Sequence, residues 1–360
     1  MIAGGGTAGH VNPAIALARA MTADSVSFIG TATGAEARLV PAAGFPIQNI
    51  SVVGFDRSKP WLLPRTAARA AGAVGEARGI LSSVSPDAVV GMGGYVSLPA
   101  VLAARSLKVP VVLHEQNIVF GLAHKVSKPF AAKVAVSFED TLADAGSKGV
   151  YVGNPVAPEF ASFSRSEKRT AALARFGLEP TRKTLLVFGG SQGARRINEA
   201  ASGLPERWSA RSDLQILHIA GRTAFQELKD QRLTSRDGCI YRVVDFVDDM
   251  TQAYAVADLA LCRGGATTLA ELALVGLPAI VVPYPYHRDR QQERQARVAE
   301  RAGAAIVLDD SATSADSLST LAAQLLDDPA RLSRMSQAFA TLARPDAADR
   351  LAEVVRSVVR

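Results

Sequence analysis

Cysteine and histidine are scarce in this chain of 360 residues, which has two cysteines and five histidines. Cys239 and Cys262 give neither a disulfide framework nor metal-ligand spacing, a pattern typical of a reducing compartment. We expect both to be structural thiols. No pair of acids flanks the glycine loops described below in the way a metal-diphosphate site requires. The sequence therefore predicts no metal site.

Long apolar runs are also missing from the sequence. No window approaches the roughly 18 apolar residues of a membrane-spanning helix, and no basic stretch followed by an apolar core resembles a signal peptide. We therefore expect a protein that is neither exported nor transmembrane. Hydrophobic residues make up 48% of the chain, so it can bury large cores, and its length favours two domains.

The charge balance is basic, with a formal net charge of +6 at pH 7. A positive surface favours anionic partners, which include nucleic acids, phosphorylated substrates and anionic lipids. Charge alone does not choose among these three classes.

Apolar runs alternate with longer helical patterns along the whole chain. We expect buried strands at 26–29, 88–90, 109–113, 133–136, 184–188, 214–219, 259–261 and 279–282. This alternation predicts an α/β fold with parallel sheets. The polar stretch 157–169 marks a domain boundary. We expect an N-terminal domain at 1–157, with a C-terminal helix at about 345–360 packing back on it, and a second domain at 165–343.

Both halves begin with a short strand, a glycine turn and a helix. The first reads MIAGGGTAGHVNPAIALA and the second reads TLLVFGGSQGARRINEA. This is the start of a nucleotide-binding unit, and it occurs twice. Ligands of doubly wound sheets bind outside the carboxyl ends of the strands. We therefore predict two Rossmann-like doubly wound domains facing a cleft.

The first glycine run satisfies the dinucleotide pattern G-x-G-x-x-G at Gly4, Gly6 and Gly9. A dinucleotide-binding domain also needs an acid at the end of its second strand, about 20 residues later, to hold the ribose hydroxyls. Asp24 precedes that strand and Glu36 lies well beyond it. The sequence thus disfavours NAD(P), although the glycines still allow backbone amides to approach an anion at a helix N-terminus.

His10 ends this loop, and we place Pro13 in the first turn of the following helix. A histidine at the positive end of a helix is held short of full protonation. It can then serve as a base or as a donor to a developing charge. The alternative is a histidine that only caps the helix or braces the loop.

Two further polar segments follow buried strands in the first half, GMGGYVSLP at 91–99 and HEQN at 114–117. Polar groups at the end of a buried strand are costly unless they are satisfied, so they bind a ligand or brace neighbouring loops. We expect His114 and Glu115 to brace, and Asn117 to contact a ligand.

The second half carries three comparable segments. Ser191 in the turn GGSQGA is either a phosphate contact or a helix cap. The segment 262–271, CRGGATTLAE, opens a helix with small residues and two threonines, which suits a diphosphate. Glu271 can accept hydrogen bonds from vicinal ribose hydroxyls, or it can complement the helix dipole. Polar side chains at 283–292 suit a sugar, and Asp248 and Asp249 read as a helix cap.

Eight motifs, in order from residue 4 to about residue 300, resemble the MurG family of peptidoglycan glycosyltransferases. They are GGGTAGHVNP, GMGGYVSLPA, VLHEQN, GNPV, GGSQGA, DFVDDM, CRGGATTLAE and DRQQ. The resemblance implies the two-domain glycosyltransferase B fold and inverting transfer of GlcNAc from UDP-GlcNAc to the C4 hydroxyl of MurNAc in lipid I, giving lipid II. It implies a peripheral position on the cytoplasmic face of the bacterial plasma membrane, alongside other cell-wall synthesis proteins, and no nucleic acid.

The resemblance also implies roles for individual residues. His10 matches the histidine suspected of catalysis. Donor-binding residues would be Thr7, Ala8, Gly9 and Asn117 at the sugar, Ser191, Ala266, Thr267, Thr268, Leu269, Ala270 and Glu271 at the diphosphate and ribose, Val247 at the uracil, and Gln292 at the GlcNAc hydroxyls. A second set of candidates comprises Gly94, Tyr95, Glu115, Gln291 and Arg263.

One position departs from the family pattern. Many members have an arginine after GNPV, assigned to the donor, where this chain has Ala157. The basic side chains that could replace it are Arg263, Arg195 and Arg196. Besides the donor and the acceptor, the resemblance implies no cofactor.

The implied acceptor is a lipid, so the enzyme must reach a membrane without spanning it. The segment 57–65, RSKPWLLPR, places Trp61, Leu62 and Leu63 between basic residues, and we expect these three to face an anionic membrane. A second basic and apolar stretch contains Lys125, Lys128, Phe130 and Lys133. The alternative is that these loops pack on their own domain.

Two other functions fit parts of the pattern. A UDP-GlcNAc 2-epimerase shares the fold and the donor but needs a carboxylate pair for proton transfer at C2, which is not evident here. A catalytically silent nucleotide-sugar-binding partner is disfavoured by His10 and DRQQ, while Ala157 leaves it open.

Overall fold

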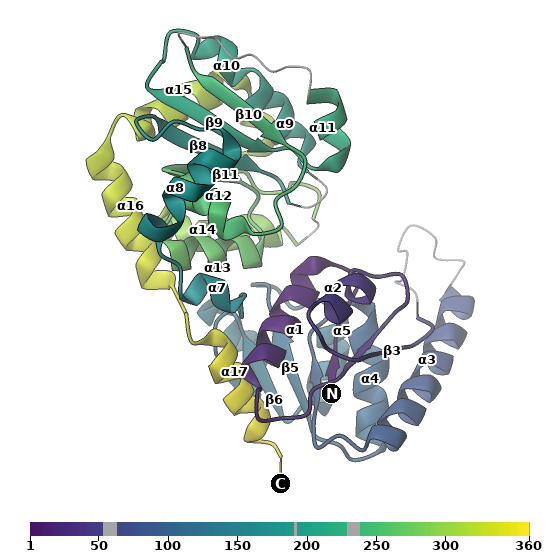
Figure 1. Ribbon diagram of the computed structural model, residues 1–360. Coiled ribbons are helices and arrows are strands. Elements are labelled where there is room, and N and C mark those ends of the chain that lie inside the picture. The colour runs from purple at the N-terminus through teal and green to yellow at the C-terminus, as the bar shows by residue number, and fades with distance from the viewer. Residues whose placement is uncertain (53–62, 191–192, 229–237, 288, 360) are drawn as a thin grey trace. The chain divides into compact units, whose positions relative to one another are not determined.

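The computed structural model describes residues 1–52, 63–190, 193–228, 238–287 and 289–359, with the backbone alone for 63–70. The chain forms two compact units (Figure 1). The first consists of Met1–Pro158 and Arg344–Arg360, and the second of Glu159–Ala343. The C-terminal segment therefore belongs to the same unit as the N-terminus.

In the described part of the first unit, seven parallel strands form one sheet in the order β3-β2-β1-β4-β5-β6-β7. The strands are β1 Ile2–Ala3, β2 Phe28–Gly30, β3 Ile47–Asn49, β4 Val89–Gly91, β5 Val111–Glu115, β6 Lys133–Val136 and β7 Gly149–Tyr151. From β1 the chain builds the sheet outward to one side and then, from β4, to the other. The loops after β1 and β4 therefore lie where ligands of such sheets bind.

Helices cover both faces of this sheet. They are α1 Ala8–Ala20, α2 Glu36–Ala42, α3 Leu63–Val84, α4 Gly94–Ser106, α5 Leu122–Ser127, α6 Leu142–Ala145 and α17 Ala347–Arg356. One core cluster joins α3 and α4 to the sheet, and another joins α1 and α17 to it. Helix α17 buries Leu351 and Val355. The helix begins at Ala347, two residues after the start of the expected range, because Asp346 is its N-cap.

In the described part of the second unit, six parallel strands form a sheet in the order β10-β9-β8-β11-β12-β13. The strands are β8 Lys183–Phe188, β9 Leu214–Ile219, β10 Ile240–Val244, β11 Leu259–Cys262, β12 Ala279–Val281 and β13 Ala305–Val307. The helices are α8 Arg165–Phe176, α9 Arg195–Ser202, α10 Leu204–Arg207, α11 Arg222–Leu228, α12 Met250–Val256, α13 Ala266–Val275, α14 Gln291–Arg301, α15 Ala315–Leu326 and α16 Pro329–Leu342. Short α7, Pro158–Ala161, connects the units. Here the order reverses between β8 and β11.

The predicted α/β fold of two doubly wound domains is confirmed by these sheets. Each predicted strand is present, with ends shifted by up to two residues. Five strands were not among the predicted apolar runs. One is β1, which belongs to the predicted strand, glycine turn and helix at the start of the chain, and the other four, β3, β7, β10 and β13, are the edges of the two sheets.

Both cysteines are free and buried, which agrees with structural thiols. Burial raises the pKa of Cys239 and of Cys262 to about 12, so neither is a thiolate at neutral pH. Among the helices that the structure describes, none combines the length and the apolar character needed to cross a bilayer.

Candidate functional site

In the first unit, the loops after β1 and β4 pack against each other. Gly94, at the start of α4, has a φ of +74°, and a Cβ there would lie 2.4 Å from the carbonyl oxygen of Gly5. A side chain at this position would therefore push the loops apart. The ring of Tyr95 lies against the first loop at Gly6. The two predicted candidates Gly94 and Tyr95 thus line the same loop pair.

Glu36 ties the first glycine loop to the end of β2. Its buried carboxylate accepts hydrogen bonds from the backbone N–H of Gly6 at 2.8 Å and from the N–H and hydroxyl of Thr31 at 3.0 and 2.7 Å. The position of Glu36, well beyond the second strand in the sequence, predicted no role for it. Helix α2 begins at this residue and turns the carboxylate back to the loop, so it binds backbone of its own unit.

His10 is the third residue of α1, whose N-cap is Thr7. Its ring is half-buried, and Nδ1 lies 3.1 Å from the hydroxyl oxygen of Thr7. Burial lowers the pKa of His10, so the imidazole is neutral at neutral pH. A Cβ on Gly93 would lie 3.2 Å from the Nε2 atom, so the second loop leaves that nitrogen space. Pro13 is the sixth residue of the helix, so our placement of it in the first turn was wrong.

Glu115 and His124 form a buried pair at the end of β5. Glu115 accepts hydrogen bonds from His124 Nδ1 at 2.8 Å and from the N–H groups of Gly121 and Asn117 at 2.9 and 3.0 Å. His124 Nε2 lies 3.2 Å from the carbonyl oxygen of Gly91. Both ring nitrogens thus lie within hydrogen-bond distance of an oxygen, which fixes the orientation of the imidazole.

This pairing sets the charge of Glu115. Burial by itself would raise the pKa of Glu115, but the charge and hydrogen bond of His124, with the two amides, lower it below its ordinary value. Asn117 is half-buried, and its side-chain amide also donates to Glu115, at 3.3 Å. Glu115 thus braces the loop, as expected, and fixes the amide of Asn117. Sequence spacing gave no sign of His124.

His114 also braces the loop. Its Nε2–H donates to the carbonyl oxygen of Gly153 at 3.1 Å, and its Nδ1 accepts from the side-chain amide of Gln116 at 3.0 Å. Burial lowers the pKa of His114 to about 4, which keeps the ring neutral.

In the second unit, α13 begins at Ala266 with Gly265 as its N-cap, directly after β11. The side chains of Ala266 and Leu269 are buried in the core, so these two candidates can offer a ligand only backbone atoms. Thr267, Thr268 and Ala270 are half-buried. The helix N-terminus directs its first amides out of the helix, an arrangement that binds anions.

Glu271 is the sixth residue of α13 and is half-buried. Its carboxylate accepts a hydrogen bond from the hydroxyl of Tyr254 at 2.7 Å. Burial raises the pKa of Glu271 to about 7, against the lowering effect of that hydrogen bond. This position is beyond the first turn, so Glu271 does not act as a dipole complement there.

The start of α14 packs on the turn before α13. Gln295 donates to the carbonyl oxygen of Gly264 at 2.7 Å. The side-chain oxygen of Gln292 accepts from the N–H of Tyr284 at 3.0 Å, and the N–H of Gln291 donates to Asp289 at 3.3 Å. These bonds hold Tyr284 and Asp289 against the start of the helix.

The motif DFVDDM precedes α12. The carboxylate of Asp249 accepts from the N–H and hydroxyl of Thr251 at 3.0 and 2.6 Å, which confirms the expected helix cap. Val247 is buried beside it. Ser191 lies outside the described residues.

The three arginines considered as replacements at Ala157 differ in what they bind. Arg263 donates to Asp310 and to two backbone carbonyl oxygens, so its guanidinium is already held by its own unit. Arg195 is exposed and pairs with Glu199 at 2.7 Å. Arg196 donates to the carbonyl oxygen of Asp310 at 3.3 Å, and within the described residues it pairs with no carboxylate.

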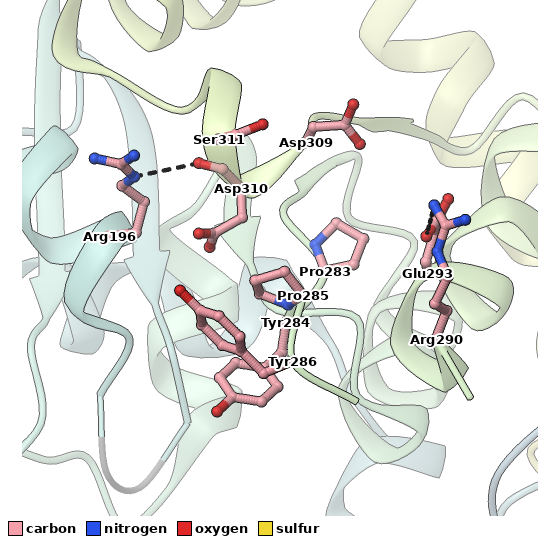
Figure 2. A pocket seen from close by; sticks show the side chains of 10 residues that line it. All are labelled: Arg196, Pro283, Tyr284, Pro285, Tyr286, Arg290, Glu293, Asp309, Asp310 and Ser311. Carbon is pink, nitrogen blue, oxygen red and sulfur yellow. Dashed lines mark hydrogen bonds and ion pairs between the residues drawn. The ribbon is translucent and has the colours of Figure 1, made fainter. Parts of the chain in front are cut away.

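Arg196 lines a pocket of about 430 Å³ (Figure 2). The pocket is lined by Arg196, Pro283, Tyr284, Pro285, Tyr286, Arg290, Glu293, Asp309, Asp310 and Ser311. The ring centroids of Tyr284 and Tyr286 are 5.3 Å apart, and Tyr286 is 78% exposed. Segments distant in the chain form this pocket, so sequence spacing does not predict it.

Three exposed apolar side chains lie close together in the sequence of the first unit, on α5 and just after it. Leu122, Val126 and Phe130 are 53%, 44% and 39% exposed, and Lys125 lies between the first two on α5. Lys128 donates to the carbonyl oxygen of Asp144 at 2.6 Å. Trp61 and Leu62 lie outside the described residues, and Leu63 is described only as the first backbone position of α3.

In the part of the chain that the structure describes, no group of three or more His, Cys, Asp or Glu side chains could hold a metal ion. The candidate residues fall into two polar sets. The first set follows β1, β4 and β5 in the first unit, and the second set follows β8, β10, β11 and β12 in the second unit.

Comparison with protein families identifies both halves. The N-terminal domain of glycosyltransferase family 28 matches residues 1–136, and the C-terminal domain of that family matches residues 184–351. The chain belongs to glycosyltransferase family 28. The family 28 match covers both polar sets.

Curated relatives cover nearly the full length of this family 28 chain. A protein from Nocardioides sp. is 42% identical over 99% of this chain and 96% of its own length. One from Halothermothrix orenii is 39% identical over 99% and 98%. Both are named UDP-N-acetylglucosamine--N-acetylmuramyl-(pentapeptide) pyrophosphoryl-undecaprenol N-acetylglucosamine transferase.

Solved structures agree with this family. The crystal structure of Acinetobacter baumannii MurG matches with a TM-score of 0.77 at 28% identity, covering 99% of this chain and 98% of that one. A UDP-GlcNAc 2-epimerase from Neisseria meningitidis matches with a TM-score of 0.67 at 13% identity, over 97% and 96%. The second likeness shows the fold alone.

Proposed function

We propose that this protein transfers GlcNAc from UDP-GlcNAc to the C4 hydroxyl of MurNAc in lipid I, giving lipid II. The observation that carries this proposal is the similarity to transferases of that name, 42% identical over 99% of the chain. The two polar sets at the strand ends supply suitable chemistry, because they combine helix N-termini with neutral hydrogen-bonding groups.

The second unit binds the donor in this proposal. Ser191 and the start of α13, Ala266–Ala270, hold the diphosphate, and Glu271 accepts hydrogen bonds from the ribose hydroxyls. Val247 contacts the uracil, and Gln292, with Gln291 beside it, recognises GlcNAc hydroxyls. Arg196 replaces the family arginine missing at Ala157, supported by its freedom from any carboxylate partner within the described residues.

The first unit binds the acceptor and positions the base. Inversion requires one displacement, in which the acceptor hydroxyl loses a proton while negative charge grows on UDP. We assign the proton to His10: when Nδ1–H donates to Thr7, Nε2 keeps the lone pair that a base needs. Ala8, Gly9 and Asn117 border the donor sugar. The amides at the start of α13 stabilise the departing diphosphate.

No tightly bound metal is required in this proposal. Helix N-termini and basic side chains supply the positive charge that the diphosphate needs. Removal of divalent cations with a chelator should leave turnover unchanged, and a return of activity only on adding metal would contradict this.

We place the protein at the cytoplasmic face of the plasma membrane, bound peripherally through the first unit. The exposed side chains of Leu122, Val126 and Phe130 support this, since their apolar surface lies beside Lys125. Binding to vesicles with and without anionic lipid should weaken for Leu122→Ser with Val126→Ser. A second variant, Trp61→Ala with Leu62→Ala, tests the other segment that we expect to face the membrane. Unchanged vesicle binding in both variants would exclude both segments as the membrane anchor.

One assay tests the activity itself. The protein is incubated with labelled UDP-GlcNAc, with and without a lipid I analogue. Label that moves to the lipid supports the transferase. Isomerisation or UDP release without the lipid supports the epimerase alternative, and binding without turnover supports a silent binding protein.

A further inference from the structure

A buried tyrosine lies behind the proposed ribose ligand. Tyr254 on α12 is 1% exposed, and its hydroxyl donates to the Glu271 carboxylate on α13 at 2.7 Å. The ring lies edge-on to Phe160 and to Phe188, with centroids 5.9 Å from each. These two contacts hold the tyrosine ring in place, so its hydroxyl has a fixed position.

The groups around Glu271 carry no compensating charge. Among the described residues, the titratable groups that interact electrostatically with Glu271 are Tyr254 on α12 and Cys262 on β11. Burial raises the pKa of both, so both are neutral. Among the described residues, no lysine or arginine forms an ion pair with Glu271. Within the part of the chain that the structure describes, the Tyr254 hydroxyl is therefore the group that stabilises the ionised form of the Glu271 carboxylate.

We propose that Tyr254 is a positioning residue for donor binding: its hydroxyl orients the Glu271 carboxylate and favours the ionised form, which accepts hydrogen bonds from the vicinal ribose hydroxyls. This rests on the proposed function, since it assumes a nucleotide-sugar donor. A carboxylate has about four acceptor sites, so one bond from Tyr254 leaves room for two hydroxyls.

The same side chain links two parts of the donor site. Phe188 is the last residue of β8 and directly precedes the glycine turn proposed to hold the diphosphate, while Glu271 belongs to the helix that follows β11. A rigid ring between them fixes the Glu271 carboxylate relative to the end of β8. Preorganisation of this kind reduces the cost of ordering the site when the donor binds.

The proposal predicts a particular pH dependence. The ionised form of Glu271 accepts hydroxyl hydrogen bonds, so donor affinity rises as the pH increases through the pKa of about 7. The Tyr254 hydrogen bond lowers this pKa, so its removal moves the acidic limb of the affinity profile to higher pH.

The test compares Tyr254→Phe with wild type by calorimetric titration of UDP-GlcNAc from pH 6 to 8.5. We expect affinity at pH 7 to fall by about 10-fold, the size of a lost hydrogen bond to a charged group, with kcat at saturating donor retained. The acidic limb should move to higher pH. Wild type should bind UDP-GlcNAc more tightly than an analogue with 2′-deoxyribose. This difference in affinity should be smaller in the Tyr254→Phe variant.

Tyr241→Phe is the matched control. Tyr241 is also buried in the second unit, and its hydroxyl contacts His218 Nδ1 at 2.7 Å. The Tyr241→Phe substitution should leave the donor affinity, and the pH dependence of that affinity, unchanged. Glu271→Gln should abolish the acidic limb and make the Tyr254→Phe change silent in the double variant.

The outcomes separate the two claims. A folded Tyr254→Phe protein with the wild-type pH profile and the wild-type loss for the deoxyribose analogue would overturn the inference, because a packing role moves neither. Wild-type protein that binds no UDP-GlcNAc would instead overturn the proposed function.

Discussion

The carboxylate of Glu36 lies 2.8 Å from the backbone nitrogen of Gly6, although 30 residues of chain separate them. The same carboxylate binds Thr31 at the end of β2. One side chain thus satisfies amides from two loops at the edge of the sheet where His10 lies. The loop geometry around His10 depends on this acid.

Glu36→Gln should therefore destabilise the protein and reduce turnover. The glutamine amide would bring a donor toward at least one N–H that now donates to the carboxylate, and a buried unsatisfied group costs about 1–3 kcal/mol. Urea denaturation measures the free energy of unfolding. Glu353→Gln, at an exposed position, is the control, and equal stability of both variants would contradict the role of Glu36.

Gly93→Ala should reduce turnover. Gly93 has a φ of +90°, and the new Cβ would lie 2.9 Å from His10 Cδ2, so the imidazole has to move. Gly44→Ala is the matched control, because Gly44 has a φ of +86° but no atom within 4 Å of the new Cβ. Both variants should lose about 1 kcal/mol of stability from backbone strain. Only Gly93→Ala should lose activity, and equal turnover in the two would remove the steric argument.

His10→Ala should lower turnover by about 100-fold or more with donor affinity retained, the scale of a lost general base. Thr7→Val should have a smaller effect of the same kind, because it removes the oxygen that lies 3.1 Å from Nδ1. Steady-state kinetics with a lipid I analogue, paired with donor titration, measures both. Turnover near the wild-type value in His10→Ala would exclude the base.

Arg196→Ala should weaken donor binding by about 10-fold, the effect of losing one charge-assisted hydrogen bond. The adjacent Arg195→Ala is the control, because Arg195 is exposed and already paired with Glu199. Titration of UDP gives both affinities. A larger loss in Arg195→Ala than in Arg196→Ala would show that the wrong arginine was assigned.

Acid should destabilise the protein below about pH 6.5. Burial lowers the pKa of His114 to about 4 and of His218 to about 3, so the stability that each neutral ring contributes is lost as pH falls from its ordinary value. Each proton taken up on unfolding lowers stability by about 1.4 kcal/mol per pH unit.

Glu271 opposes this trend, since its pKa is raised to about 7 and protonation favours the folded state. Glu271→Gln removes the opposing effect. Between pH 6.5 and 4.5 that variant should lose unfolding free energy more steeply than wild type, as measured by urea denaturation at several pH values. Parallel curves would show that Glu271 does not titrate as inferred.

The central strands could be predicted from the sequence, whereas the edge strands could not. Strands β8 and β9 are buried along nearly their whole length and are rich in apolar residues, because parallel strands inside a sheet are covered on both faces. Strand β3, Ile47–Asn49, lies at an edge and is partly exposed, so its residues carry no such run.

The sequence by itself determined the class of fold, the two glycine-turn units and the polar segments after the strands, because burial and backbone conformation demand particular residue types at those positions. Tertiary structure alone decided which side chains support them. Glu36, His124 and Tyr254 reach their partners Gly6, Glu115 and Glu271 across separate elements. Contacts of that kind leave no periodic trace in the chain, since folding rather than spacing brings the groups together.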